Sequence, residues 1–330
     1  MSKPFASLLI ASACSLPLVG HAAALEGVVA SIKPVHSLVA GVMEGIASPA
    51  LLVDGAGSPH AYSMRPSQAR ALENAGVVFW VGPGLETFLA GSLETLGADA
   101  TVVELADAEG LVLHGFREGG PFEEHDHGAE GHDDGDHADE GAHDEGHAHD
   151  GDHAHGGHDD MHLWLDPLNA RILVGKIGDV LAEADPGNAD AYAANVAAMS
   201  EKLDALVSET EAELAPVKDK GFIVFHDAYQ YYEKRFGIEA AGSITVSPEA
   251  QPGAQRVSEI KAKVAELDAA CVFAEPQFEP RLISIVAEGT DARTAVLDPL
   301  GADIEDGPDL YFELIRNLTT SLTTCLGGRG

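Results

Sequence analysis

The chain has 330 residues and carries 54 acidic against 19 basic side chains, which gives a formal net charge of −35. Nucleic acids and anionic membrane surfaces repel such a polyanion, so we exclude both as partners and favour a protein that handles cations. The length suits one large domain or two medium ones with an ample hydrophobic core.

The first 24 residues have the features of a secretory signal peptide. One basic residue precedes an apolar stretch from Phe5 to Val19, and residues 22–24 form an Ala-x-Ala cleavage site. That stretch is too short to span a bilayer, and no later stretch reaches the required length. We therefore expect cleavage near Ala24 and a periplasmic protein, while a lipoprotein attached through Cys14 is the less favoured alternative.

Short apolar runs alternate with helical patterns after the signal peptide, which predicts βα units around parallel sheets. In the first half, strands are expected at residues 28–32, 51–53, 77–81 and 102–105, and helices at 34–43, 67–74 and from 85 onward. In the second half, strands are expected at residues 222–225, 244–246, 271–274 and 294–297, and helices at 227–236, 257–267, 280–288 and the C-terminus.

One long amphipathic helix is predicted over residues 189–214, because apolar side chains recur there at spacings of three and four. Pro216 lies just past its end. The chain is therefore predicted to be an α/β protein with two βα lobes of parallel-type sheets joined by this helix. The expected divisions are a signal peptide at 1–24, an N-terminal lobe at 25–188, a linking helix at 189–215 and a C-terminal lobe at 216–330.

The most unusual segment lies between Glu123 and Asp160, where ten histidines and fifteen carboxylates occur without a lysine or arginine. Imidazole is a common transition-metal ligand near neutral pH, and carboxylates attract divalent cations. The segment cannot bury apolar surface, so we predict a disordered insert at 117–160 that captures metal, with a solvated acidic spacer as the alternative. Its histidines are His125, His127, His132, His137, His143, His147, His149, His153, His155 and His158.

Outside the insert and the signal peptide, five histidines remain: His36, His60, His114, His162 and His226. His60 lies in the loop after an expected strand, and His226 and Asp298 directly follow two others. In open α/β sheets the ligand crevice lies at the carboxyl ends of the strands. Three imidazoles and one carboxylate suit Zn²⁺, whereas Mn²⁺ would recruit more oxygen. A lone histidine is often only a core or capping residue, and we interpret His36, on an early helix, and His114, beside the insert, as structural or peripheral.

Two cysteines, Cys271 and Cys325, remain after removal of the signal peptide. An oxidising compartment and an even cysteine count favour one disulfide between them. Two buried free thiols are the alternative.

Six segments of the chain resemble those of the zinc-binding periplasmic component of zinc-uptake ABC transporters. They are S-I-K-P-V-H-S-L-V-A-G from Ser31, S-P-H-A-Y-S-M-R-P-S from Ser58, D-M-H-L-W-L-D-P from Asp160, F-H-D-A-Y-Q-Y-Y from Phe225, F-A-E-P-Q-F from Phe273 and L-D-P-L-G from Leu297. The resemblance extends over essentially the whole mature chain, and this combination of segments is highly specific.

This resemblance implies two βα lobes bridged by a rigid helix, with the metal in the cleft between the lobes. The ligand histidines of the family fall on His60, His162 and His226. Asp298 matches the position of a carboxylate ligand in manganese-type relatives, which water or another carboxylate replaces in some zinc-type members. We therefore expect Asp298 either to be the fourth ligand or to hold a water. The His-rich insert and a Cys271–Cys325 disulfide also match traits of the family.

The resulting hypothesis is a non-enzymatic periplasmic protein that binds Zn²⁺ and delivers it to the membrane permease of an ABC importer. We expect a monomer, and a periplasmic metallochaperone is a candidate further partner. The alternatives are a manganese or iron importer component, a periplasmic zinc store, and a zinc hydrolase with Glu275 as its general base. No ATP site is expected, because the sequence lacks a Gly-x-x-x-x-Gly-Lys-Ser/Thr loop.

Overall fold

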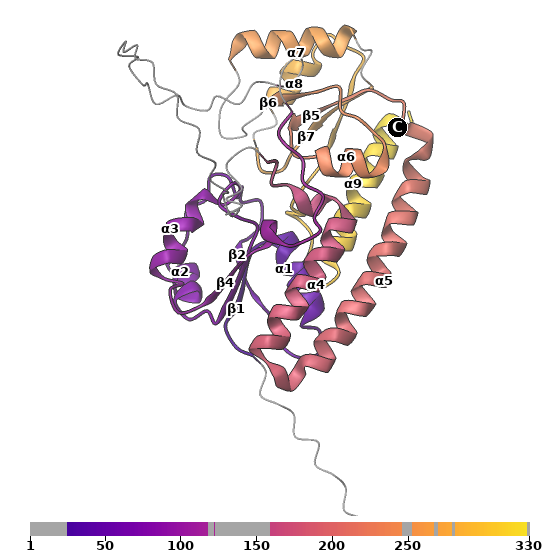
Figure 1. Ribbon diagram of the computed structural model, residues 1–330. Coiled ribbons are helices and arrows are strands. Elements are labelled where there is room, and N and C mark those ends of the chain that lie inside the picture. Colours follow the sequence, from indigo (N-terminus) through magenta and orange to yellow (C-terminus); the bar gives the residue numbers. More distant parts are fainter. Residues whose placement is uncertain are drawn as a thin grey trace, which may run out of the picture.

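A computed structural model of the chain describes residues 25–117, 122, 159–245, 253–266, 270–278 and 281–328. The predictions for the signal peptide and for the ten insert histidines lie outside these residues. Within them, two four-stranded parallel sheets and their helices confirm the predicted α/β class (Figure 1).

The N-terminal sheet has the strand order β2-β1-β3-β4, with all neighbours parallel. Every residue of the two central strands, β1 and β3, is buried, as expected for a parallel sheet that is covered on both faces. The elements are β1 (Val28–Ile32), α1 (Lys33–Val42), β2 (Ala50–Val53), α2 (Pro66–Glu73), β3 (Val77–Trp80), α3 (Thr87–Thr95) and β4 (Thr101–Glu104).

The C-terminal sheet repeats this arrangement with the order β6-β5-β7-β8, again all parallel. In each sheet the first strand therefore lies between the second and the third, and the crevice at the carboxyl end of the first strand is a favoured ligand site. The elements are β5 (Phe222–His226), α6 (Gln230–Phe236), β6 (Gly242–Thr245), α7 (Ala254–Glu266), β7 (Cys271–Ala274), α8 (Arg281–Ala287), β8 (Arg293–Val296) and α9 (Leu310–Leu326).

Most expected strands and helices occur within one or two residues of their predicted bounds. Two helices start three residues away from their predicted positions: α6 begins at Gln230 and not at Asp227, and α7 begins at Ala254 and not at Val257. A tight turn follows β5, in which the Ala228 amide donates to the His226 carbonyl at 3.0 Å. Three boundary residues of predicted elements, at 246, 267 and 280, lie outside the described part of the chain.

Two long helices, α4 (Pro167–Ala184) and α5 (Ala189–Leu214), form a hairpin that runs along the molecule (Figure 1). The 26 residues of α5 coincide with the predicted long helix. The side chain of Asp166 caps the start of α4 by accepting a 2.8 Å hydrogen bond from the Leu168 amide. Gly178 allows the two helices to approach closely, since a Cβ atom there would lie only 2.4 Å from Val196.

The two lobes share one hydrophobic core, which includes residues from the central strands of both sheets and from helices α1, α4, α5 and α9. Direct hydrogen bonds also join the lobes. Trp164 Nε1 donates to the Pro299 carbonyl at 2.9 Å, and the buried Lys33 Nζ donates to the Ile304 carbonyl at 2.7 Å. These contacts restrain any rotation of one lobe against the other.

The structure confirms the predicted disulfide between Cys271 and Cys325, whose Cα atoms are 6.1 Å apart. Cys271 begins β7 and Cys325 lies in the last turn of α9. The bond therefore attaches the C-terminal helix to the C-terminal sheet.

Candidate metal centre

Three histidines that lie far apart in the sequence meet where the two lobes face each other. His60 lies in the loop after β2, His162 precedes the 3₁₀ turn Leu163–Leu165, and His226 is the last residue of β5. His162 Nε2 lies 3.2 Å from His60 Nε2 and 3.3 Å from His226 Nε2. The ligand atoms of all three lie within 4.8 Å of one another, and no second group of this kind occurs among the described residues.

The spacing of these nitrogen atoms matches the requirements of a tetrahedral ion. Zn²⁺ binds imidazole nitrogen at about 2.0–2.1 Å, so two such ligands at a tetrahedral angle lie about 3.3 Å apart. The rings of His60 and His226 are nearly perpendicular, at 85°, so they converge edge to face and do not stack. The three imidazoles can therefore bind one ion with little rearrangement.

Two buried carboxylates fix the orientation of two of the rings. Asp160 Oδ1 lies 2.7 Å from His162 Nδ1, and Glu275 Oε1 lies 2.7 Å from His226 Nδ1. Both carboxylates are at most 3% exposed. A carboxylate only accepts, so each Nδ1 carries the proton and each Nε2 directs its lone pair toward the centre. No carboxylate partner of His60 occurs among the described residues.

The pKa values of two of the histidines shift in opposite directions. Burial, together with the nearby His162 and His226 rings, holds the pKa of His60 well below its usual value. Burial acts in the same direction on His226, but the negative charges of Glu275, Asp227 and Asp160 outweigh it and raise the pKa of His226. Neutral imidazole is the form that binds metal, so His60 is ready to bind at neutral pH, whereas His226 holds its proton more firmly.

Asp298 lies beside this group but outside it. Its carboxylate accepts hydrogen bonds from Gln277 Nε2 at 2.8 Å and from the Leu300 amide at 3.0 Å, and a third from the Ala302 amide. It therefore caps the loop after β8, and its role as a fourth ligand stays a prediction. The two other histidines are also remote: His36 Nε2 donates to the Pro49 carbonyl, and the His114 ring packs against Tyr231.

Comparison with known proteins places the chain in a family. The family model described as zinc-uptake complex component A, periplasmic (ZnuA), matches residues 28–325. The chain belongs to this family. The high-affinity zinc uptake system protein ZnuA of Brucella abortus is 56% identical over 326 residues, which cover 97% of each chain.

Solved structures share the fold of this zinc-uptake family member. A crystal structure of ZnuA has a TM-score of 0.69 at 23% identity and covers 89% of this chain and 98% of its own. FpvC from Pseudomonas aeruginosa, in complex with Mn²⁺, has a TM-score of 0.70 at 20% identity and covers 92% and 98%. Because both are similar in fold, the fold alone does not select the metal, and the donor atoms must be considered.

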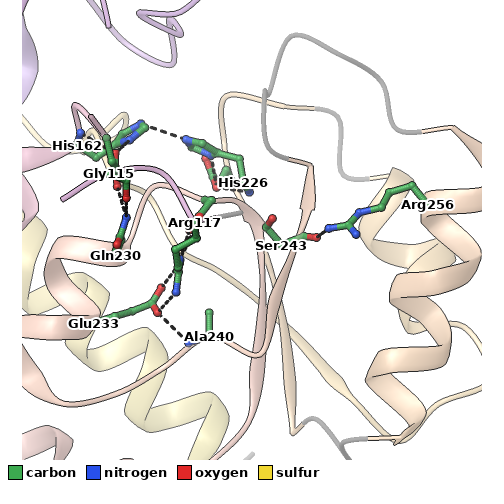
Figure 2. A network of polar contacts seen from close by, with 12 residues as sticks. Gly115, Arg117, His162, His226, Gln230, Glu233, Ala240, Ser243 and Arg256 are labelled. Carbon is green, nitrogen blue, oxygen red and sulfur yellow. Dashed lines mark hydrogen bonds and ion pairs between the residues drawn. The ribbon is translucent and has the colours of Figure 1, made fainter. Parts of the chain in front are cut away.

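Helix α6 supports the centre from the side of the C-terminal lobe (Figure 2). Gln230 Nε2 donates to the Gly115 carbonyl at 3.1 Å and to Asp160 Oδ2 at 3.3 Å, and the Tyr231 hydroxyl donates to the Asp160 carbonyl at 2.6 Å. Gly115 and Asp159 form an antiparallel bridge. This bridge holds together the residues on either side of the insert histidines, three positions from His162.

An ion-pair cluster continues this support. The Arg117 guanidinium pairs with Asp227, the residue after His226, and lies 2.7 Å from Glu233 Oε2 on α6. Both carboxylates are at least nine-tenths buried. Figure 2 shows Arg117 and Glu233 below the His162–His226 pair. Arg117, the first residue of the segment predicted to be disordered, instead joins the start of that segment to the residues that follow β5.

Sequence reasoning did not identify Asp160 and Glu275 as the partners of the histidines. Signals were present for both: Asp160 precedes His162 by two positions, and Glu275 follows β7, the strand that pairs with the one ending at His226. Arg117, Asp227, Gln230 and Glu233 carried no comparable signal.

In the part of the chain that the structure describes, no helix has the length and apolarity needed to cross a membrane.

Proposed function

We propose that this chain is the solute-binding component of a zinc ABC importer and that it holds one Zn²⁺ between His60, His162 and His226. The convergence of three imidazoles at tetrahedral spacing carries this proposal, together with membership of the periplasmic zinc-uptake family. Relatives named as high-affinity zinc uptake proteins support zinc as the cargo. Zinc is the transported substrate here, so the chain acts as a carrier and not as an enzyme.

The donor set favours zinc over manganese or iron. All three convergent atoms are nitrogen, which suits a borderline-soft ion, whereas Mn²⁺ prefers carboxylate and carbonyl oxygen. The hydrolase alternative requires a free general base near the ion. Glu275, its candidate, is hydrogen-bonded to His226 Nδ1, which fits an orienting role better.

Delivery to the permease then depends on local movement. The shared core and the interlobe hydrogen bonds resist a large hinge rotation, so docking on the permease is expected to displace the loops that carry His60 and His162. We propose that residues 1–24 are removed on export and that the protein acts as a monomer. The insert histidines are proposed as weaker auxiliary zinc sites. A periplasmic metallochaperone is proposed as a further partner that exchanges zinc with these auxiliary sites.

Metal analysis of the purified mature protein tests the proposal. After exposure to equal concentrations of Zn²⁺ and Mn²⁺, we expect about one tightly held zinc per chain and no retained manganese. Cells that lack this chain should grow poorly in zinc-depleted medium and recover with the wild-type gene but not with His226→Ala. Retention of manganese, or rescue by His226→Ala, would exclude the proposed function.

A further inference from the structure

Three polar atoms without hydrogen-bond partners belong to residues that line the cavity at the metal centre. Among the described residues, seven buried side-chain atoms lack a partner, and Ser58 Oγ, Glu275 Oε2 and Gln277 Oε1 are three of them. All three residues line the same cavity as the histidines. An unpaired buried polar atom costs about 1–3 kcal/mol and is uncommon in folded proteins. Their concentration at one cavity indicates that a ligand satisfies them.

The orientation of the Gln277 carboxamide follows from its contact with Asp298. The Asp298 carboxylate can only accept, so the atom of Gln277 that lies 2.8 Å from it must be the NH₂ group. The carboxamide oxygen is therefore the atom left without a partner at the cavity. Asp298 itself is fixed by the Leu300 and Ala302 amides, so it acts on the cavity through Gln277.

The balance of charge also favours a neutral oxygen at this position. Asp160 and Glu275 are both buried and together carry two negative charges, which one divalent ion balances. These two carboxylates contact the histidine rings and not the ion. A further carboxylate bound to the ion itself would add a buried negative charge that nothing compensates, which is costly. The volume open to the centre of a water molecule is only about 10 Å³. That is room for about one particle of this size. An ion held there leaves little room for a water beside it, which favours a donor from the cavity wall.

We propose that the fourth donor to the ion is the carboxamide oxygen of Gln277, and that Asp298 is a positioning residue that holds this side chain in place. The inference rests on the proposed function, because it takes the three histidines as the other donors. A neutral amide oxygen is a weaker donor than a carboxylate. This suits a carrier that must bind its cargo selectively and then release it.

A double-mutant cycle separates this arrangement from direct binding by Asp298. Zinc affinity is measured by chelator competition for the wild-type protein, Gln277→Leu, Asp298→Ala and the double variant. Gln277→Leu should weaken binding about 10- to 100-fold. Asp298→Ala alone should clearly weaken zinc binding. Because Asp298 acts through Gln277, adding Asp298→Ala to Gln277→Leu should change the zinc affinity less than about twofold.

The visible absorption of bound Co²⁺ gives a readout that is independent of affinity. Loss of the oxygen donor should change the band shape in Gln277→Leu, and the same substitution at the exposed Gln255 should leave both readouts unchanged. Thermal unfolding of the metal-free proteins checks the fold, and Gln277→Met replaces the leucine variant if that variant is unfolded.

Two results would overturn the proposal: unchanged zinc affinity in Gln277→Leu, or an equally large effect of Asp298→Ala with and without Gln277. Either result leaves the proposed function intact as long as His226→Ala abolishes tight binding. Tight zinc binding by His226→Ala would instead reject the proposed function itself.

Discussion

The two lobes have the same strand order, but they hold their histidines in different ways. The C-terminal lobe supplies His226 from the end of a central strand, where the residue is 3% exposed and bonded to Glu275, which directly follows the neighbouring strand β7. The N-terminal lobe supplies His60 from a Gly-Ser-Pro loop, where it is half-buried and no carboxylate partner occurs among the described residues. His226 is therefore a fixed ligand of the C-terminal lobe, whereas the N-terminal lobe supplies both the fixed His162, bonded to Asp160, and His60, a ligand that can move.

This asymmetry suggests an order of events during release. The ligand that loses least by moving is His60, because no buried carboxylate depends on it. Movement of His226 would leave Glu275 buried without its partner, which is costly. Docking that displaces the His60 loop would therefore open the site while the C-terminal lobe keeps its structure.

The strongest test of this contrast is the removal of single imidazoles. We expect His60→Ala, His162→Ala and His226→Ala each to weaken zinc binding by more than about 100-fold, because few ligands hold the ion. His226→Ala should also destabilise the metal-free protein, whereas His60→Ala should not. Chelator competition and urea unfolding measure the two effects.

The control variants for this prediction are His36→Ala and His114→Ala, which lie outside the metal centre and should retain the wild-type zinc affinity. Equal metal-free stability of His60→Ala and His226→Ala would mean that the two lobes hold their ligands equally firmly.

The link between the lobes at Arg117 should have the next largest effect. Arg117→Leu leaves the buried Asp227 and Glu233 without their cation, and we expect a loss of about 3–5 kcal/mol in the free energy of unfolding. Arg316→Leu is the matched control, since its pair with Glu209 is exposed and should contribute less than about 1 kcal/mol. Equal losses in urea unfolding would show that the Arg117 cluster is only a surface feature.

Only the C-terminal lobe carries the disulfide, so its removal should weaken that lobe selectively. The bond closes a loop of 54 residues. In the chain-entropy model, such a bond contributes about 4 kcal/mol. We expect Cys271→Ala/Cys325→Ala to lose an amount of this order in urea unfolding. Protein isolated from the periplasm should show no reactive thiol, and labelling of two thiols in that material would contradict the bond.

The sequence was sufficient to predict the two lobes and the three histidines. It was not sufficient to predict the side chains that orient those histidines. The spacing of apolar residues predicted both ends of α5, at residues 189 and 214. Asp298 shows the limit. Its place after a strand was predictable, but the direction of its carboxylate depends on two loop amides that the sequence does not reveal.

The pairing of Arg117 with Asp227 and Glu233 was unpredictable for a related reason. Arg117 borders a highly charged segment, where a basic residue is expected to be solvated, and its partners lie more than 100 positions away in the sequence. The tertiary contact, and not any local pattern, decides that this side chain is buried.

The smallest expected effect concerns Glu86, a buried carboxylate of the N-terminal lobe. None of its hydrogen-bond partners is a cation. It accepts from the Ser31 hydroxyl and from the Val81 and Gly82 amides. Burial, which outweighs these hydrogen bonds, raises the pKa of Glu86 from 4.5 to about 7. The folded protein therefore binds this proton more tightly than the unfolded chain does.

The sign of the pH effect follows from this difference. The contribution of Glu86 to stability is fully present below pH 4.5 and is lost as the pH rises through about 7. At about 1.4 kcal/mol for each pKa unit, the loss is about 3 kcal/mol. Glu86→Gln mimics the protonated form, so it should match the wild type in urea unfolding near pH 5 and exceed it at pH 8. Parallel stability profiles of the two proteins from pH 5 to pH 8 would mean that Glu86 is already ionised in the folded lobe, and that the N-terminal lobe tolerates a buried charge as well as the C-terminal lobe does.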